Sequence, residues 1–320
     1  MIAQEIDVWR TVVVEATDSR ADDVVALTLR DPEGQHLPAW EPGAHIDVDL
    51  GPGLSRQYSL CGDPRTADRW RIAVLREPRG RGGSARIHDH VRVGDRLQVR
   101  GPRNRFPLAD AERYFLVAGG IGITPILAMA TKVAALGRPW TLLYGGRTRS
   151  SMAFLDELTA LPGGELIVVP QDEFGLPDLD RYLAVPADGT VVYCCGPGPM
   201  LSAVEQACGA WPAGTLHRER FSAEVPQPDA DSGSFEVVLK RSGLRLAVPE
   251  HEPLLDVLEA SGIELDNSCR AGICGTCAVG VVSGEPDHCD DVLTDEERER
   301  GEIMLPCVSR SRGRVLVLDL

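Results

Sequence analysis

Four cysteines near the C-terminus have the spacing of an iron–sulfur ligand set. Cys269, Cys274 and Cys277 follow a C-x4-C-x2-C pattern, and Cys307 comes after a further 29 residues. Four thiolates at this spacing can hold a 2Fe–2S cluster. Structural zinc also takes four cysteines, but its usual pattern is two C-x2-C pairs, and only one such pair is present. The pattern therefore favours a 2Fe–2S cluster over zinc.

The residues between these cysteines suit a cluster loop. Gly272 and Gly275 let the backbone wrap tightly and turn N–H groups toward the sulfur atoms. Ile273 can shield the cluster from water, which affects its reduction potential. Because a 2Fe–2S centre carries one electron at a time, we expect the preceding part of the chain to supply electrons from a two-electron donor.

Length and composition limit the possible classes of protein. The chain has 320 residues and 43% hydrophobic residues, which suits two or three domains with proper cores. No run of about 20 apolar residues occurs, and the N-terminal sequence lacks the pattern of a secretory signal. Nine cysteines without an export signal favour metal binding in a reducing compartment, so we expect a cytoplasmic location.

The net charge of −15 disfavours nucleic acid and anionic membranes as partners. It suits docking to a basic patch on another protein, although solubility alone is enough to explain such a charge.

Residues 1–108 are predicted to form a small antiparallel β-barrel. Short stretches of alternating apolar and polar residues are separated by Pro/Gly turns, which is typical of such barrels. The expected strands are Thr11–Glu15, Val24–Leu29, His45–Leu50, Gln57–Leu60, Arg71–Leu75 and Arg96–Arg100.

Two stretches of this region can bind a phosphate-bearing ring. Along the strand near residue 57, alternation places Arg56 and Tyr58 on one face, where an arginine can clamp a phosphate and a tyrosine can pack on a flat ring. Further on, Gly82, Gly83 and Ser84 open a helix whose first N–H groups can cradle a phosphate. Alone, the first stretch also fits an ordinary edge strand and the second a flexible turn.

Residues 109–223 alternate strands and helices, which indicates a parallel sheet with right-handed crossovers. The expected strands are Arg113–Ala118, Trp140–Tyr144, Leu166–Pro170 and Thr190–Cys195, and the expected helices are Ile126–Leu136, Ser151–Leu161 and Leu179–Leu183. Gly119, Gly120 and Gly122 follow the first strand, at the position where bare backbone approaches a dinucleotide pyrophosphate. Pro125 replaces the third glycine of the usual G-x-G-x-x-G pattern.

A second Gly/Pro turn, with Gly196 and Pro197, follows the last of these strands directly after Cys195. The carboxyl ends of strands are where open α/β sheets bind ligands. A buried packing role is the alternative for Cys195. Arg147, Arg149, Ser150 and Ser151 follow the second strand, where arginine favours the 2′-phosphate of NADPH.

The remaining residues form a linker and a small third domain. Residues 224–234 are Pro-rich, acidic and without apolar periodicity, so they read as a linker. Residues 235–320 are predicted to form a small mixed sheet, with a hairpin over Phe235–Lys240 and Arg245–Val248, a helix over Leu254–Ser261, and strands over Cys277–Val282 and Val315–Leu318. Thr294 and Glu297 have the spacing of a helix capping box.

Taken together, these motifs resemble the ferredoxin–NADP reductase superfamily. The R-x-Y-S strand and the G-x-x-S turn are similar to its flavin-binding barrel, which implies that Arg56, Tyr58, Ser59, Gly82, Gly83 and Ser84 contact the flavin. The two glycine turns resemble its NAD(P)-binding domain. That resemblance implies that Cys195 lies near the nicotinamide and that Phe221 lies near the flavin ring. It also implies that Thr124 orients the nicotinamide or the flavin N5.

The order of barrel, nucleotide domain and C-terminal plant-type ferredoxin covers the whole chain. It resembles the phthalate dioxygenase reductase and vanillate O-demethylase reductase family. The fold class expected is an antiparallel flavin barrel, an α/β nucleotide domain and an α+β, β-grasp-like ferredoxin domain. The resemblance implies FMN rather than FAD, NADH rather than NADPH, and a monomer that docks transiently.

The implied function is electron transfer from NAD(P)H through FMN and the cluster to a terminal oxygenase. The partner expected is a Rieske non-haem iron oxygenase or O-demethylase that acts on an aromatic compound. Three alternatives stay open: a reductase for a cytochrome-type monooxygenase, a self-contained oxygen-using flavoenzyme, and a stand-alone redox or sensor module.

Overall fold

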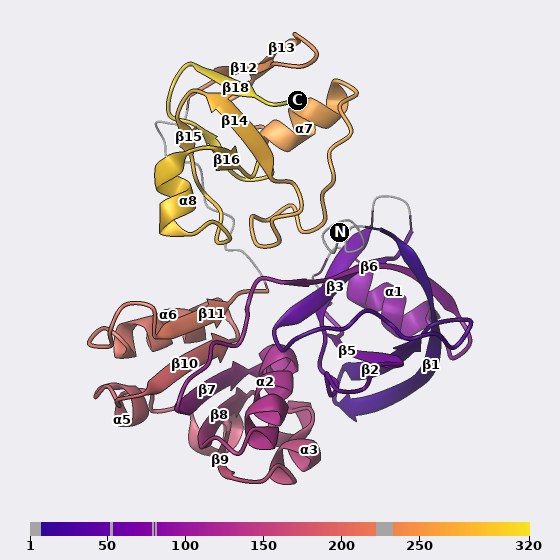
Figure 1. Cartoon of the computed structure of the whole chain (residues 1–320), viewed down its shortest axis with the longest axis vertical. Helices are drawn as coiled ribbons and strands as arrows, with labels where there is room; N and C mark the ends of the chain where they lie inside the picture. The colour runs from indigo at the N-terminus through magenta and orange to yellow at the C-terminus, as the bar shows by residue number, and fades with distance from the viewer. Residues whose placement is uncertain (1–7, 52–53, 79, 81, 222–232) are drawn as a thin grey trace. The chain divides into compact units, whose positions relative to one another are not determined.

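A computed structural model of the chain describes residues 8–51, 54–78, 80, 82–221 and 233–320 (Figure 1). The chain divides into two compact units, Met1–Phe221 and Ser222–Leu320, and each is described here by itself. Nearly all of the predicted linker, residues 224–232, lies outside the described residues. In the part of the chain that is described, no helix combines the length and the apolar character needed to cross a bilayer.

The first unit begins with an antiparallel six-stranded sheet that closes into a barrel, as predicted. Its strands lie in the order β4-β3-β6-β1-β2-β5, and an antiparallel bridge between Leu60 and Ile72 joins the two ends. The elements are β1 (Arg10–Ala21), β2 (Val24–Arg30), β3 (Ala44–Asp49), β4 (Ser55–Ser59), β5 (Arg69–Leu75), α1 (Gly83–His90) and β6 (Arg96–Asn104).

Alternating residues of these strands form the barrel core. Val12, Val14, Ile46 and Val48 are fully buried, and Ile87 of α1 packs into the same cluster. Strand β1 is longer than predicted because its polar second half continues to pair with β2 across bulges. The extension depends on backbone hydrogen bonds alone. Its sequence has no alternation of apolar and polar residues from which it could be predicted.

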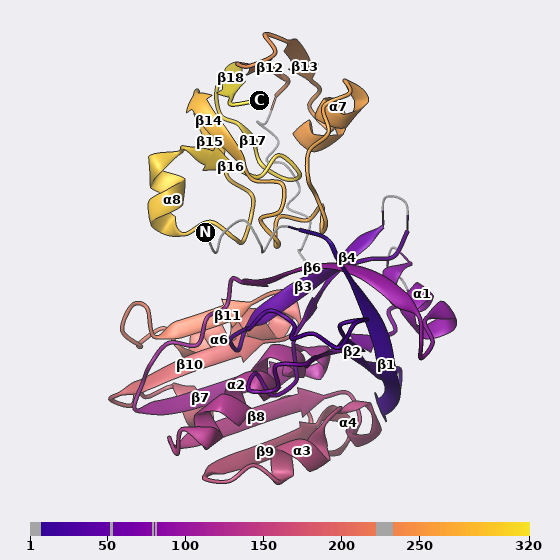
Figure 2. The ribbon, with the colours of Figure 1, turned by 45° about the vertical axis from the view of Figure 1, so that its right-hand side comes forward.

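The second part of this unit is a five-stranded parallel sheet in the order β11-β10-β7-β8-β9 (Figure 2). Its elements are β7 (Arg113–Gly119), the 3-10 turn η1 (Gly120–Gly122), α2 (Ile123–Ala135), β8 (Trp140–Gly146), the 3-10 turn η2 (Arg149–Ser151), α3 (Leu155–Thr159), β9 (Gly164–Pro170), α4 (Gln171–Phe174), α5 (Asp180–Leu183), β10 (Thr190–Cys195), α6 (Gly198–Ala207) and β11 (Leu216–Glu219).

Helices cover both faces of this parallel sheet. Leu116 and Ala118 of β7 pack with α2, whereas Val117 packs with α5 and α6 on the other face. The chain moves outward from β7 through β8 to β9 and then returns to place β10 on the opposite side of β7. The carboxyl ends of β7 and β10 therefore form the topological switch point at which such sheets bind ligands.

Two predicted helices have different bounds. The helix expected over Ser151–Leu161 is wrong at its start, because Ser151 ends a 3-10 turn and Phe154 has a left-handed φ of 64°. Only Leu155–Thr159 is α-helical. Helix α2 begins at Ile123 instead of Ile126, which puts Pro125 in its first turn, where its missing N–H costs no hydrogen bond.

The second unit contains a mixed five-stranded sheet in the order β13-β12-β18-β14-β16, with α7 packed on it. Strands β12 and β18 are parallel, and the predicted hairpin and capping box are both present. The elements are β12 (Phe235–Leu239), β13 (Arg245–Val248), α7 (Leu254–Ala260), β14 (Val279–Ser283), β15 (Pro286–Asp287), α8 (Asp295–Arg300), β16 (Ile303–Met304), β17 (Arg310–Ser311) and β18 (Val315–Leu318).

Candidate functional site

The four cysteines of the C-terminal pattern come together in the second unit. Cys269 shares hydrogen bonds with Cys274 and Cys307, and Cys277 shares one with Cys307. Those to Cys274 and Cys307 hold the pKa of the Cys269 thiol well below its usual range. Cys274, Cys277 and Cys307 are buried. These hydrogen bonds link the four thiols in one series, from Cys274 through Cys269 and Cys307 to Cys277, as expected of side chains that would bind one 2Fe–2S cluster.

The backbone of the cluster loop also fits this role. The N–H of Ala271 donates to the sulfur of Cys269 at 3.3 Å, and the N–H of Thr276 donates to the sulfur of Cys274 at 3.5 Å. Donors of this kind stabilise charged thiolates. Gly272 and Gly275 have φ values of 70° and 69°, which only glycine adopts without strain.

Arg270 holds the loop from outside. It has a left-handed φ of 52°, and its guanidinium is bound by the side chains of Asn267, Asp256 and Glu259. Asp256 and Glu259 belong to α7, so these contacts fix the start of the loop to a packed helix. The loop is therefore braced by side chains at the residue that follows its first cysteine.

In the barrel, the two predicted phosphate-binding stretches lie against each other. A Cβ built on Gly83 would stand 2.6 Å from Cγ of Arg56 and 3.2 Å from its Nε. Helix α1 starts at Gly83 after Gly82, whose φ is 86° and which provides no side-chain cap. The first N–H groups of α1 and the Arg56 side chain can therefore reach one anion.

The other predicted flavin contacts are placed differently. The Ser84 hydroxyl accepts a hydrogen bond from the N–H of Glu77 at 2.9 Å and so braces the turn. Tyr58 is half-buried against the barrel core, and burial raises the pKa of its hydroxyl. Ser59 is buried at the end of β4. Tyr58 offers a partly open ring beside Arg56.

At the switch point, the two glycine turns are in contact. A Cβ on Gly122 would lie 2.2 Å from the carbonyl oxygen of Cys195, and one on Gly119 would lie 2.6 Å from Pro197. The Cα of Gly119 lies 3.2 Å from the Cβ position of Gly196. Glycine is needed here because the two backbones approach too closely for side chains.

Thr124 and Cys195 are both buried behind these turns. The Thr124 hydroxyl donates to the carbonyl of Ile121 at 3.0 Å, which leaves its oxygen free to accept. Burial is the main cause that raises the pKa of the Cys195 thiol, and the nearby Glu219 carboxyl is the second. The thiol therefore stays protonated at neutral pH. Phe221, at the end of this unit, has 40% of its surface exposed.

Glu219 is a site residue that the sequence did not reveal. It ends β11 directly beside Cys195 in the sheet register, and its Oε2 is buried without a hydrogen-bond partner. Burial raises the pKa of this carboxyl to about 8. Glu219 stands between two arginines in the sequence, and such charged neighbours do not indicate that it is buried. Only the pairing of β10 with β11 places it at the switch point.

Arg149, one of the two arginines after β8, is less available to a 2′-phosphate than the sequence suggests. Arg149 binds Glu173 of α4 through Nε at 3.2 Å and Nη2 at 3.0 Å. The Ser150 hydroxyl donates to Asp22 of the barrel at 2.5 Å, and Ser151 closes a capping box with Thr148. Arg149, Ser150 and Ser151 are thus already engaged and a carboxylate lies beside Arg149, whereas Arg147 is exposed.

Known protein families match the chain over the cluster site and over the two glycine turns. Residues 237–312 match the 2Fe-2S iron-sulfur cluster binding domain, and residues 116–206 match the oxidoreductase NAD-binding domain. Vanillate O-demethylase oxidoreductase of a Pseudomonas species is 42% identical over 97% of this chain and 99% of its own. Phthalate dioxygenase reductase of Burkholderia cepacia is 38% identical over the full length of both chains.

Solved structures agree with these relatives. A phthalate dioxygenase reductase structure has a TM-score of 0.73 at 38% identity and covers 98% of each chain. An intact type IV self-sufficient cytochrome P450 monooxygenase has a TM-score of 0.90 at 48% identity. This chain covers 41% of that larger protein, and 98% of this chain is matched.

Proposed function

The chain belongs to the phthalate dioxygenase reductase and vanillate O-demethylase reductase family, and on that premise we propose that it passes electrons from NADH through FMN and a 2Fe–2S cluster to a partner oxygenase. The observation that carries this proposal is the convergence of four thiols in a chain that also brings two glycine turns together at a nucleotide-binding switch point. We assign residues 1–108 to FMN, 109–223 to the nucleotide and 235–320 to the cluster.

In the barrel, Arg56 and the first N–H groups of α1 hold the FMN phosphate. Tyr58 and Ser59 contact its ring system, and Phe221 packs on the ring from the end of β11. Bound FMN supplies the conversion of two-electron into one-electron transfer. The contact between Arg56 and Gly83 supports this assignment, because it joins both phosphate-binding stretches in one place.

At the switch point, Gly119, Gly120 and Gly122 bind the pyrophosphate, and Gly196 and Pro197 form the opposite wall. Hydride transfer needs aligned rings more than an acid or a base. Cys195 and Thr124 accordingly act as neutral positioning groups for the nicotinamide. The pKa values of Cys195 and Glu219 are both raised, so at neutral pH the thiol is protonated and the carboxyl is largely neutral, and neither would place a negative charge beside the ring.

NADH is the preferred nucleotide. The ion pair of Arg149 with Glu173 engages one of the two arginines that would attract a 2′-phosphate and adds a carboxylate that repels it. An acidic group near the ribose selects NADH in sheets of this kind. Here the acidic residue comes from the segment after β9 instead of from the end of the second strand.

The cluster is held by Cys269, Cys274, Cys277 and Cys307. The contacts of Cys269 with Cys274 and Cys307, and of Cys277 with Cys307, support this assignment, because they bring the four thiols to one place where they would bind the irons. The cytoplasm suits this assembly, because iron–sulfur ligands must stay reduced and none of the nine cysteines, all of which lie in described residues, forms a disulfide.

The electron acceptor is a Rieske non-haem iron oxygenase or O-demethylase that acts on an aromatic compound, and the reductase docks to it as a monomer. The names of the full-length relatives support this partner. The second candidate is a cytochrome P450, which the likeness to a self-sufficient P450 favours. Adding a Rieske-type oxygenase or an isolated P450 haem domain to the reductase, and measuring which one restores substrate-coupled NADH consumption, distinguishes the two.

The core of the proposal is tested by anaerobic titration of the purified protein with NADH and then NADPH. We expect about one FMN and two irons per chain, and sequential bleaching of the flavin and cluster bands with NADH. Zinc in place of iron, or a cluster that stays oxidised while the flavin bleaches, would contradict the proposed electron path.

A further inference from the structure

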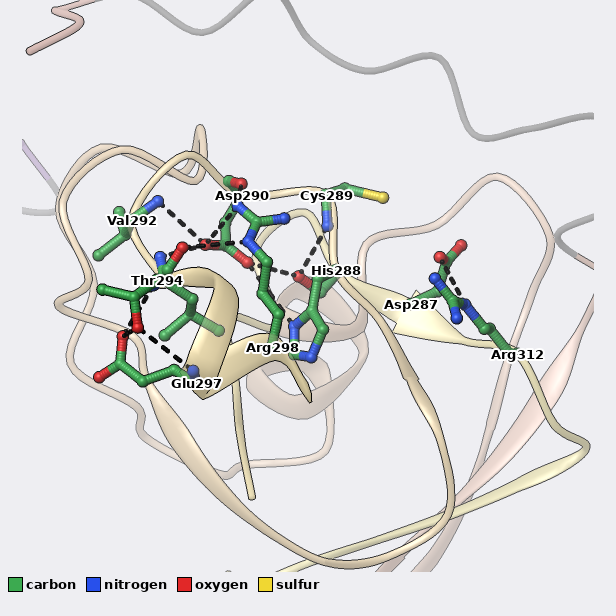
Figure 3. Close-up of polar contacts among 11 residues, drawn as sticks. Asp287, His288, Cys289, Asp290, Val292, Thr294, Glu297, Arg298 and Arg312 are labelled. Carbon is green, nitrogen blue, oxygen red and sulfur yellow. Dashed lines mark hydrogen bonds and ion pairs between the residues drawn. The ribbon is translucent and has the colours of Figure 1, made fainter. Parts of the chain in front are cut away.

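One carboxylate in the second unit is buried beside the cluster loop without being a ligand. Asp290 lies in the segment between β15 and α8, and its side chain is completely buried. Its Oδ1 accepts hydrogen bonds from the N–H groups of Val292 at 3.0 Å and Leu293 at 2.8 Å (Figure 3). A buried carboxylate is costly unless it is hydrogen-bonded, so these bonds fix the loop around it.

The other oxygen of Asp290 faces the segment that carries the fourth cysteine. The Ser309 hydroxyl donates to Oδ2 of Asp290 at 3.5 Å and accepts from the N–H of Cys289 at 3.3 Å. Ser309 is buried, and its own N–H donates to the carbonyl of Leu305 across the turn that contains Cys307. Asp290 and Ser309 therefore connect the loop before α8 to the backbone around Cys307.

The same loop also contacts the segment between the first and second cysteines. The N–H of Asp291 donates to the carbonyl of Gly272 at 2.9 Å. A Cβ on Gly272 would lie 3.1 Å from Cα of Asp290 and 2.7 Å from Cγ2 of Val308. Gly272 is thus packed between the Asp290 backbone and the residue that follows Cys307.

Arg298 of α8 closes the loop from the outer side. Its Nε donates to the carbonyl of Leu293 at 3.0 Å, and its Nη2 donates to the carbonyl of Asp290. Nη2 also lies 3.6 Å from Oδ1 of Asp290, so the buried carboxylate has a cation beside it. Figure 3 shows Val292 and Arg298 in contact with Asp290.

We propose that Asp290 is a positioning residue that holds the 269–277 loop and the Cys307 segment at the separation the cluster needs. It acts through Ser309 on one side and through the packing of its backbone on Gly272 on the other. This inference rests on the proposed cluster ligation but concerns a residue outside the ligand set. Its function is to keep the two ligand-bearing segments together while the cluster is bound.

The test compares four variants as purified holoproteins. Asp290→Ala removes both acceptor oxygens, and Asp290→Asn keeps the shape, one acceptor for the loop N–H groups and a donor toward Ser309. Ser309→Ala breaks only the connection to the Cys307 segment. Val237→Ala is the matched control, because it destabilises the buried sheet core of the second unit and lies outside the cluster of side chains around Cys277 and Cys307.

Two measurements on each variant report on the cluster itself: the rate of iron loss to a chelator and the electron paramagnetic resonance spectrum after dithionite reduction. We expect Asp290→Ala to lose iron at least about fivefold faster, with shifted or broadened g values, because one connection between the ligand-bearing segments is lost. Ser309→Ala should increase the rate of iron loss by a smaller factor. The rate and the spectrum of Asp290→Asn should be close to those of wild type. Val237→Ala should lower the melting temperature and leave both readouts unchanged.

The inference is overturned if Asp290→Ala loses iron at the wild-type rate and has the wild-type spectrum. It is also overturned if Val237→Ala accelerates iron loss as much, since the effect would then be general destabilisation. If Asp290→Ala does not fold, Ser309→Ala decides by the same criteria. Absence of iron from the wild-type protein would instead contradict the proposed function, so the two failures are distinguishable.

Discussion

Arg56 lies directly on the backbone of Gly83, although the two residues belong to different elements of the barrel. The side chain of Arg56, from β4, occupies the space that a Cβ at the start of α1 would need. Neither residue identifies a binding site alone, because an arginine on an edge strand and a glycine turn are both common. Their contact creates a position where a guanidinium and helix N–H groups face the same anion.

Substitution of Gly83 by alanine therefore tests the flavin phosphate site. The added Cβ would stand 2.6 Å from Cγ of Arg56 and would displace the guanidinium. We expect FMN affinity to fall by roughly tenfold or more, which corresponds to loss of one charge-assisted contact. Fluorescence titration of the apoprotein with FMN measures this.

The control for that variant is Gly62→Ala, in the same barrel. Its Cβ would lie 3.4 Å from Cβ of Arg71, an ordinary contact distance, and its backbone has no left-handed φ. Unchanged FMN affinity is expected here. Equal loss in both variants would mean that the barrel, and not the Arg56 contact, responds to the added methyl group.

Gly122→Ala should separate the two turns of the nucleotide site. Its Cβ would meet the Cys195 carbonyl at 2.2 Å, and both groups are backbone or attached to it, so neither can rotate away. We expect reduction of bound FMN by NADH to slow by about two orders of magnitude, because a misplacement of about 1 Å can have that effect. Anaerobic stopped-flow absorbance at the flavin band measures the rate, and a rate near that of wild type would exclude this site.

Replacement of Glu173 by glutamine should relax the preference for NADH. The change removes the carboxylate that pairs with Arg149 and leaves the guanidinium available to a 2′-phosphate. Because exposed ion pairs contribute about 0–1 kcal/mol, we expect kcat/KM for NADPH to rise by about twofold to fivefold, with little change for NADH.

A double variant, Glu173→Gln with Arg149→Ala, is the control for that selectivity change. It removes the cation as well, so the gain with NADPH should disappear. A gain that persists without Arg149 would show that another group binds the phosphate.

Glu219 should make the stability of the first unit depend on pH. Its pKa is raised by burial from 4.5 to about 8, so the folded chain holds a proton that the unfolded chain releases between these values. Stability is then full below about pH 4.5 and decreases as pH rises through 8. The upper limit of this contribution is on the order of 5 kcal/mol.

Calorimetric melting of wild type and Glu219→Gln from about pH 6 to about pH 9, which brackets the raised pKa, checks this expectation. The amide does not ionise, so the decrease in melting temperature of the first unit should be smaller in the variant. Parallel pH profiles in the two proteins would show that Glu219 is exposed or already ionised in the folded chain.

Cys274→Ser should separate the two halves of the electron path. Loss of one of the four converging thiols weakens or abolishes the cluster. We expect cytochrome c reduction to fall to background under anaerobic conditions. Reduction of FMN by NADH should stay within about twofold of wild type, because hydride transfer between the two cofactors of the first unit does not involve this residue. Cytochrome c reduction at the wild-type rate would contradict transfer through the cluster.

The sequence by itself determined the elements with strong local patterns. Alternation along β2 to β6 indicated the barrel, and glycine turns after apolar strands marked the nucleotide-binding edge. The C-x4-C-x2-C spacing indicated three candidate cluster ligands that are close in sequence, whereas Cys307 joins them only through the fold. Thr294 and Glu297 also formed their capping box, because that interaction spans a single turn.

The tertiary structure decided what depends on residues far apart in the chain. Glu219 became a site residue only through the pairing of β11 with β10, and Arg149 was neutralised by Glu173 from another element. The connection from Asp290 through Ser309 to the Cys307 segment is equally invisible in sequence. Burial and pairing of charges depend on how segments that are distant in the sequence pack together. Such packing produces no local sequence pattern, whereas turns and ligand spacing do.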